Sequence, residues 1–221
     1  MTPQALAAVR TVIAAACAKA KRKVDSVTLV AVSKKQPNEK IEAAYALGIR
    51  DFGENYAQEL RDKAAALQLS GIRWHAIGPV QLKNAKYVAK AAHTFHALES
   101  EEVAVELNKR REGAPLRVLI EVNVAGEASK AGVAEADVPA LLQKVRALPK
   151  LEAVGLTAMP PLVDDAELNR PHFKGLAALA KTLGLPELSM GSTADYGVAI
   201  EEGATLVRVG TALFGERPPN P

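Results

Sequence analysis

The stretch Val27-Thr28-Leu29-Val30-Ala31-Val32-Ser33-Lys34 is apolar and rich in β-branched residues until it ends in a hydroxyl and an amine. This pattern predicts a strand that is buried on both faces. Lys34 would then lie at the carboxyl end of that strand. An amine at the edge of an apolar environment suits a lysine that forms a Schiff base with a carbonyl compound.

Similar short apolar runs recur along the rest of the chain. Amphipathic stretches with apolar residues at i, i+3 and i+4 separate them. The predicted strands cover residues 27–34, 51–55, 72–78, 94–98, 117–124, 151–159, 187–191 and 205–210. The predicted helices cover residues 2–21, 37–47, 56–67, 83–92, 101–111, 135–148, 168–183 and 194–202.

Strands and helices thus alternate through 221 residues, a length at which αβ barrels form a single unit. The sequence predicts one α/β domain over residues 1–221, a parallel (β/α)8 TIM barrel with an extra helix at the amino terminus. An open dinucleotide-binding sheet would carry Gly-x-Gly-x-x-Gly after its first strand. The sequence Ser33-Lys34-Lys35-Gln36-Pro37 does not match that motif.

The composition excludes several classes of protein. Hydrophobic residues make up 48% of the chain and charged residues 24%, a balance typical of a globular protein with a sizeable core. The net charge of +3 comes without a basic stripe, which argues against nucleic acid and membrane surfaces as partners. Cys17 is the single cysteine, and the first ten residues lack the order of a signal peptide, so we expect a cytoplasmic protein. The four histidines have no metal-ligand spacing.

In a barrel, the carboxyl ends of the strands meet at one edge, here called the mouth, where ligands bind. The sequence therefore predicts a short set of residues that share this edge, which includes Lys34, Asn55, His75, Asn123, Thr157, Met159, Ser192, Thr193, Arg208, Gly210 and Thr211. Of the four histidines, we expect only His75 to reach it. We interpret Trp74 as a packing residue rather than a ligand-stacking one.

Two glycine and hydroxyl pairs predict a phosphate site. Gly191-Ser192-Thr193 follows the seventh predicted strand and Gly210-Thr211 follows the eighth. Barrels often bind phosphate with these two loops, because glycine lets the backbone approach and a helix amino terminus presents free N–H groups. Either loop alone is more typical of a helix cap than of a phosphate site. Their occurrence together favours phosphate.

Lys34 and Lys35 compete as the reactive amine. The apolar strand before Lys34 and the like charge of Lys35 are expected to lower the pKa of Lys34. Strand alternation would place the two side chains on opposite faces, so only one can point into the mouth. Parity alone does not say which one.

Arg208 alternates with Val207 and Val209 in the last predicted strand, where a buried guanidinium needs acceptors for its hydrogen bonds. A ligand ring nitrogen is one such acceptor, and an arginine there would leave a pyridine nitrogen unprotonated. An ion pair with Glu121 or a similar strand carboxylate is the alternative.

The motifs together resemble the pyridoxal phosphate homeostasis protein family, called YggS in bacteria and PROSC in animals. The resemblance rests on Ala31-Val32-Ser33-Lys34, Phe52-Gly53-Glu54-Asn55-Tyr56, Trp74-His75-Ala76-Ile77-Gly78-Pro79, Ser129-Lys130-Ala131-Gly132, Gly155-Leu156 and the segment from Val207 to Gly215. The family has the barrel of the alanine racemase N-terminal domain. The resemblance thus implies the cofactor pyridoxal 5′-phosphate (PLP), held as an internal aldimine.

By this resemblance Lys34 is the cofactor lysine and Arg208 faces the pyridine nitrogen. The phosphate would be held by Ser192, Thr193, Gly210 and Thr211, while Asn55 and His75 would line the pocket. Lys130 falls where the family carries a second lysine near the site. Ser192-Thr193-Ala194-Asp195 departs from the usual Met-Ser-x-Asp, so the hydroxyl that meets the phosphate stays open. Thr157 stands where methionine is common.

The function implied is PLP binding and intracellular PLP homeostasis without catalytic turnover, with PLP-dependent apoenzymes as possible recipients and a monomer as the expected state. The alternative is a single-domain amino-acid racemase, which needs an acid–base residue on each face of the ring. Tyr56 and Tyr196 are the candidates for the second one. A third interpretation is a class I aldolase in which Lys34 attacks a substrate without a cofactor.

Overall fold

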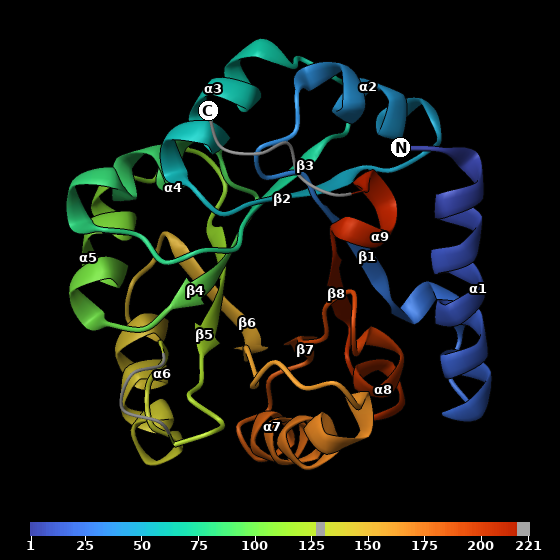
Figure 1. Cartoon of the computed structure of the whole chain (residues 1–221). Coiled ribbons are helices and arrows are strands. Elements are labelled where there is room, and N and C mark those ends of the chain that lie inside the picture. The colour runs from blue at the N-terminus through green and yellow to red at the C-terminus, as the bar shows by residue number, and fades with distance from the viewer. Residues whose placement is uncertain (127–130, 216–221) are drawn as a thin grey trace.

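The computed structural model describes residues 1–126 and 131–215. Within them, parallel strands close into a barrel in the order β1-β2-β3-β4-β5-β6-β7-β8, as Figure 1 shows. The strands are β1 Thr28–Val32, β2 Asp51–Glu54, β3 Arg73–Ala76, β4 Thr94–Leu98, β5 Leu116–Glu121, β6 Leu151–Thr157, β7 Glu187–Ser189 and β8 Leu206–Val209. The predicted (β/α)8 barrel is confirmed.

Helices surround the barrel (Figure 1). They are α1 Pro3–Lys19, α2 Asn38–Ala46, α3 Ala57–Ala66, α4 Ala85–Ala91, α5 Glu101–Arg110, α6 Val138–Arg146, α7 Arg170–Thr182, α8 Tyr196–Glu201 and α9 Thr211–Phe214. The extra amino-terminal helix α1 packs against α8 and α9. Thr2 caps it, because its hydroxyl accepts a hydrogen bond from the N–H of Ala5. No helix in residues 1–126 and 131–215 is long and apolar enough to cross a bilayer.

The predicted element boundaries differ from the observed ones mostly at the ends. Every predicted strand except β4 extends one or more residues beyond the observed carboxyl end, because those residues turn into the loops of the mouth. The helices predicted at 83–92, 135–148 and 168–183 begin with short 3₁₀ turns at Leu82–Asn84, Glu135–Asp137 and Ala166–Asn169. A 3₁₀ turn is a common way to start a helix, and hydrophobic periodicity does not distinguish it from α-helix.

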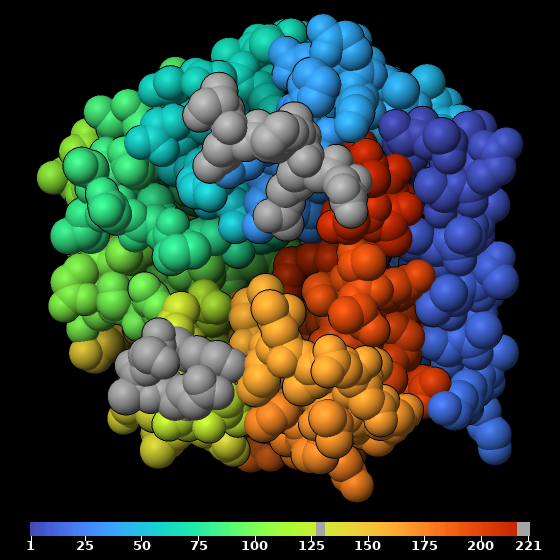
Figure 2. Space-filling model, in the orientation of Figure 1, coloured from blue at the N-terminus to red at the C-terminus, as the bar shows by residue number. Residues whose placement is uncertain are grey.

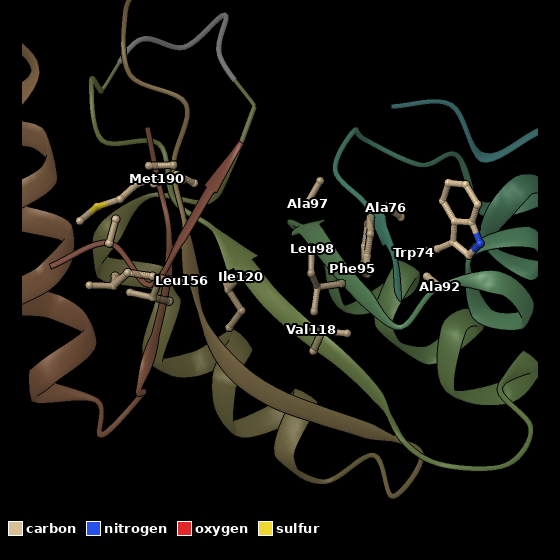
Figure 3. Packing of buried hydrophobic residues seen from close by; sticks show 14 of the residues in the cluster. Trp74, Ala76, Ala92, Phe95, Ala97, Leu98, Val118, Ile120, Leu156 and Met190 are labelled. Carbon is tan, nitrogen blue, oxygen red and sulfur yellow. The ribbon is translucent and has the colours of Figure 1, made fainter. Parts of the chain in front are cut away.

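The apolar core lies mainly between the barrel and its helices. Trp74 is buried there and its ring lies 5.8 Å from that of Phe52, so the packing role expected for Trp74 is confirmed. Figure 3 shows Trp74 beside Ala92, outside β3. A second, small cluster of Val30, Leu119, Val154 and Leu206 fills part of the barrel interior. Much of the remaining interior is polar, with His75, His96, Ser189 and Arg208 all buried.

Candidate functional site

The loops after β1 and β8 meet at the mouth, because these two strands are neighbours in the closed barrel. Lys34 follows β1 and lines a small crevice of about 10 Å³ together with Val32, Gln36, Gly210, Thr211 and Gly215. A Cβ atom on Gly210 would lie 3.4 Å from the carbonyl oxygen of Val32, so the two loops are in contact. The structure therefore brings the candidate amine and the last glycine loop together. Figure 2 shows the surface hollowed near the middle of the barrel.

Lys34, and not Lys35, lines this crevice. Lys34 is half-buried, whereas Lys35 is exposed and has a left-handed backbone with φ of 58°. Both residues lie beyond the end of β1, so the alternation rule of a strand does not apply to them. The turn decides the direction of each side chain.

A buried ionic cluster holds this turn. It consists of Ser33, Glu54, Glu59 and Lys63. The ammonium of Lys63 donates to the Ser33 carbonyl at 2.7 Å, to Glu54 at 2.8 Å and to Glu59 at 2.7 Å. The Ser33 hydroxyl donates to Glu54 at 2.6 Å and the Lys35 N–H to Glu59 at 2.6 Å. Backbone groups on both sides of Lys34 are therefore bound to the cluster.

Glu54 is the most constrained member of the cluster. Burial raises its pKa, while the Lys63 ammonium and two hydrogen bonds oppose that shift. Its second oxygen, Oε2, is buried without a hydrogen-bond partner among the described residues. Sequence reasoning placed Glu54 at the mouth within the motif Phe52-Gly53-Glu54-Asn55-Tyr56 but gave it no role, and it missed Lys63. The available signal was a charged residue at the end of a short strand, followed by a lysine on the inner face of the next helix.

Arg208 is buried and its terminal nitrogens are held by neutral groups. Its Nη1 donates to the Thr157 hydroxyl at 3.0 Å, to the Ser189 carbonyl at 2.7 Å and to the Ser189 hydroxyl. Its Nη2 donates to the Ala158 carbonyl at 3.0 Å and lies 2.8 Å from the Met159 sulfur. The guanidinium is thus fixed in one plane. One of its acceptors is Thr157, which stands where methionine is common in the family.

No carboxylate of the described residues forms an ion pair with Arg208, so the predicted alternative of a Glu121 ion pair is not observed. Burial lowers the pKa of Arg208 to about 10, and Glu121 and Asp195 partly oppose that shift through their charges. Its Nε makes no hydrogen bond within the described residues, which leaves this N–H for a ligand acceptor. Arg208 also borders a crevice of about 30 Å³ that Gly191, Ser192, Asp195 and the loop 159–163 complete.

The loops after β7 and β8 converge as predicted. The N–H of Gly210 donates to the Thr193 hydroxyl at 3.4 Å. Ser192 faces Asp195 instead, since both its N–H and its hydroxyl donate to that carboxylate, at 2.7 Å and 3.1 Å. Thr193 and Thr211 are exposed. In this arrangement the hydroxyl of Thr193 hydrogen-bonds the glycine loop, whereas that of Ser192 hydrogen-bonds Asp195.

Asn55 lies where predicted, directly after β2 and half-buried. The loop after β3 passes its backbone closely, because a Cβ on Gly78 would be 2.4 Å from the Asn55 carbonyl oxygen. Tyr56 is exposed at the start of α3, and Tyr196 is buried at the start of α8. Lys130 lies outside the described residues.

His75 does not reach the mouth, and that expectation is wrong. Its ring points into the barrel, where Nδ1 contacts His96 at 2.8 Å and Nε2 contacts Asp51 at 2.9 Å. Asp51 is the first residue of β2, and His75 lines a pocket of about 480 Å³ with residues at the amino ends of the strands, among them Thr28 and Arg73. The physical reason is that an inward side chain near the middle of a strand can turn to either end. The nearest carboxylate lies at the amino end.

Comparisons with known proteins decide the family. The model of the family "Alanine racemase, N-terminal domain" matches residues 9–218. A pyridoxal phosphate homeostasis protein of Pseudomonas aeruginosa is 43% identical over 196 residues, which cover 87% of this chain and 85% of the relative. The one of Escherichia coli K12 is 38% identical over 222 residues, covering 96% and 95%. The chain belongs to the pyridoxal phosphate homeostasis protein family.

Solved structures agree with this family. The structure of PipY of Synechococcus elongatus with PLP bound matches at 34% identity with a TM-score of 0.78, covering 86% of this chain and 93% of PipY. Alanine racemase of Corynebacterium glutamicum matches at 18% identity with a TM-score of 0.66 and shares the fold alone. The chain covers 61% of that racemase but almost the full length of its homeostasis relatives.

Proposed function

We propose that this protein binds pyridoxal 5′-phosphate through Lys34 and takes part in PLP homeostasis. The observation that carries the proposal is that Lys34, Gly210 and Thr211 line one crevice at the mouth. The relatives of this chain are named pyridoxal phosphate homeostasis proteins. When bound, PLP supplies an aldehyde carbon for a lysine amine and an electron-withdrawing pyridine ring. The protein supplies the amine, the anion site and the hydrogen-bond donor.

The residues present fit such a ligand. Lys34 is half-buried and its turn is held by the Lys63 cluster. Gly210, Thr211 and Thr193 offer backbone N–H groups and hydroxyls for a phosphate. Arg208 keeps one N–H without a protein partner among the described residues. An arginine, which holds its own proton, leaves the pyridine nitrogen unprotonated and limits how strongly the ring withdraws electrons.

We further propose that the protein has no racemase turnover. Racemisation by two bases needs an acid–base group on the ring face opposite the lysine. Burial raises the pKa of Tyr196, which keeps its phenol protonated at neutral pH, and Tyr56 is 51% exposed at the start of α3. Such a site is consistent with a monomeric protein that holds PLP and passes it to PLP-dependent apoenzymes.

The test is the absorbance of the purified protein with PLP, followed by borohydride reduction and peptide mapping. We expect the wild type to absorb visible light and the reduced adduct to map to Lys34. The Lys34→Ala variant should lack both, and the matched variant Lys35→Ala should keep both. An adduct on Lys35 would overturn the assignment of the amine, and a wild type without any adduct would overturn cofactor binding. Racemisation of alanine by the loaded protein would overturn the proposed lack of turnover.

A further inference from the structure

A line of hydrogen bonds runs through the inside of the barrel from Arg208 toward the amino ends of the strands. Arg208 donates to the Ser189 hydroxyl, and Ser189 Oγ lies 2.8 Å from His96 Nδ1. His96 Nε2 lies 2.8 Å from His75 Nδ1, and His75 Nε2 lies 2.9 Å from Asp51. We call Asp51, His75, His96 and Ser189 the interior chain. Its members come from β2, β3, β4 and β7.

Elementary hydrogen-bond chemistry assigns one direction to every link. A guanidinium only donates, so the Ser189 oxygen accepts from Arg208 and its own proton is left for His96 Nδ1. His96 Nδ1 is then an acceptor, which places the His96 proton on Nε2, where it is donated to His75 Nδ1. By the same rule, His75 carries its proton on Nε2 and donates it to Asp51. Each link therefore donates away from the buried cation and toward the carboxylate.

The surroundings favour this direction over the reverse one. His96 is completely buried, and burial together with nearby cations lowers its pKa well below the ordinary value, so it stays neutral. Asp51 stays ionised, because the hydrogen bonds from His75 and Arg73 and the charge of Arg73 outweigh its burial and lower its pKa to about 2. Reversal would also leave the Ser189 proton without an acceptor, since Oγ contacts only Arg208 and His96 among the described residues.

We propose that the interior chain is a positioning relay that sets the place of Arg208 at the mouth from the opposite end of the barrel. The inference rests on the proposed function, in which Arg208 faces the ring of PLP. Asp51 orients His75, each histidine orients the next group, and Ser189 presents its lone pair to the guanidinium. The Arg208 N–H that the described residues leave without an acceptor is thereby held toward the ligand.

The first test needs no cofactor. Nitrogen-15 NMR of the imidazole rings in the PLP-free protein reports which nitrogen of each histidine carries the proton. We expect protonated Nε2 and unprotonated Nδ1 for both His75 and His96. In Ser189→Ala, His96 loses its donor at Nδ1 and that resonance should shift, while the resonances of His93 stay in place. A proton on Nδ1 of either His75 or His96 in the wild type would overturn the relay.

The second test is PLP titration of Ser189→Ala, His75→Phe and the double variant. Ser189→Ala should weaken binding about three- to tenfold, the effect of one buried hydrogen bond. His75→Phe, which does not touch Arg208, should weaken it about threefold, and the double variant should bind no more weakly than Ser189→Ala alone. His93→Phe is the matched control, because His93 lines the same amino-terminal pocket and its ring hydrogen-bonds only Thr94 among the described residues.

The outcomes separate the two proposals. Urea denaturation of each variant checks that the PLP affinities being compared are those of folded proteins. Wild-type affinity in folded His75→Phe, or additive losses in the double variant, would overturn the relay while PLP binding stands. A wild type that takes up no PLP would overturn the proposed function, and the NMR assignment would still decide the direction of the interior chain.

Discussion

Arg208 shows how one residue of the mouth depends on its neighbours. Its two terminal nitrogens use hydroxyl, carbonyl and thioether acceptors from Thr157, Ala158, Met159 and Ser189. A planar fork of donors matches this set, whereas the ammonium of a lysine is a compact point charge. The position therefore selects arginine for its shape as well as its charge.

Arg208→Lys is expected to weaken PLP binding at least tenfold and to lower the free energy of unfolding by about 1–3 kcal/mol, because buried acceptors lose their donors. PLP titration and urea denaturation measure the two effects. Arg10→Lys, at an exposed position on α1, is the control and should match the wild type. A folded Arg208→Lys protein with wild-type PLP affinity would contradict the proposed contact with the ring.

Lys63→Met tests the ionic cluster. Removing one partner of a buried pair leaves the other charge uncompensated, so we expect a loss of about 3–5 kcal/mol in the free energy of unfolding at neutral pH. The double variant Glu54→Gln with Lys63→Met should recover part of that loss, because the buried carboxylate that Lys63 paired with is then replaced by a neutral amide. Urea denaturation checks both. Equal stability of the single and double variants would show that the unpaired Glu54 carboxylate does not cause the loss of stability in Lys63→Met.

At the scale of elements, the ends of the strands carry the site while their middles carry the barrel. Lys34, Asn55, Ser192 and Gly210 all follow a strand directly or within three residues. The ladder holds each strand end in register with its neighbours, so the loops begin from fixed points. Close strand pairing is therefore a condition for the site, and β6 and β7 show it most clearly.

Gly155 lets β6 approach β7, since a Cβ there would lie 2.1 Å from the Glu187 carbonyl oxygen. Gly155→Ala is expected to lower the free energy of unfolding by about 2–4 kcal/mol, because the backbone of β6 or β7 must move to make room for the added Cβ. Gly175→Ala in α7 is the matched control. Nothing lies within 4 Å of its added Cβ, and alanine favours a helix, so we expect a gain of up to about 1 kcal/mol. Equal effects of the two substitutions by thermal or urea denaturation would refute the close contact.

At the scale of the whole molecule, folding buries several carboxyl groups, and two of them, Glu54 and Glu121, have raised pKa values. Burial raises the pKa of both Glu54 and Glu121 from 4.5 to about 7. Between those values the folded protein binds more protons than the unfolded chain, so stability decreases as the pH rises through this window. Stability is greatest, as far as these groups decide it, when both are protonated.

Glu121→Gln removes one of the two groups. Between about pH 5 and about pH 8, the unfolding free energy of the variant should decrease less than that of the wild type. The expected difference is about 3 kcal/mol, because each unit of pKa shift corresponds to about 1.4 kcal/mol. Urea denaturation at the two pH values measures the difference. A wild type that becomes more stable over this interval would contradict the raised pKa values.

Sequence pattern alone determined the barrel, because the alternation of apolar runs with amphipathic stretches is a local property that each segment carries by itself. It also located Lys34, Arg208 and the two glycine loops, since the carboxyl end of a strand can be recognised from the residues around it. Tertiary structure decided the rest. The direction of Lys34 against Lys35 depends on a turn held by Glu54, Glu59 and Lys63, which are brought there from β2 and α3.

His75 is the clearest case of what the sequence left undetermined. Its place in β3 is local information, but the end of the barrel toward which its ring turns depends on Asp51 and His96 in the neighbouring strands. The partners of a buried polar group are set by strand register and barrel closure. Hydrophobic periodicity predicts which residues face inward, and only the closed barrel shows which inward residues meet.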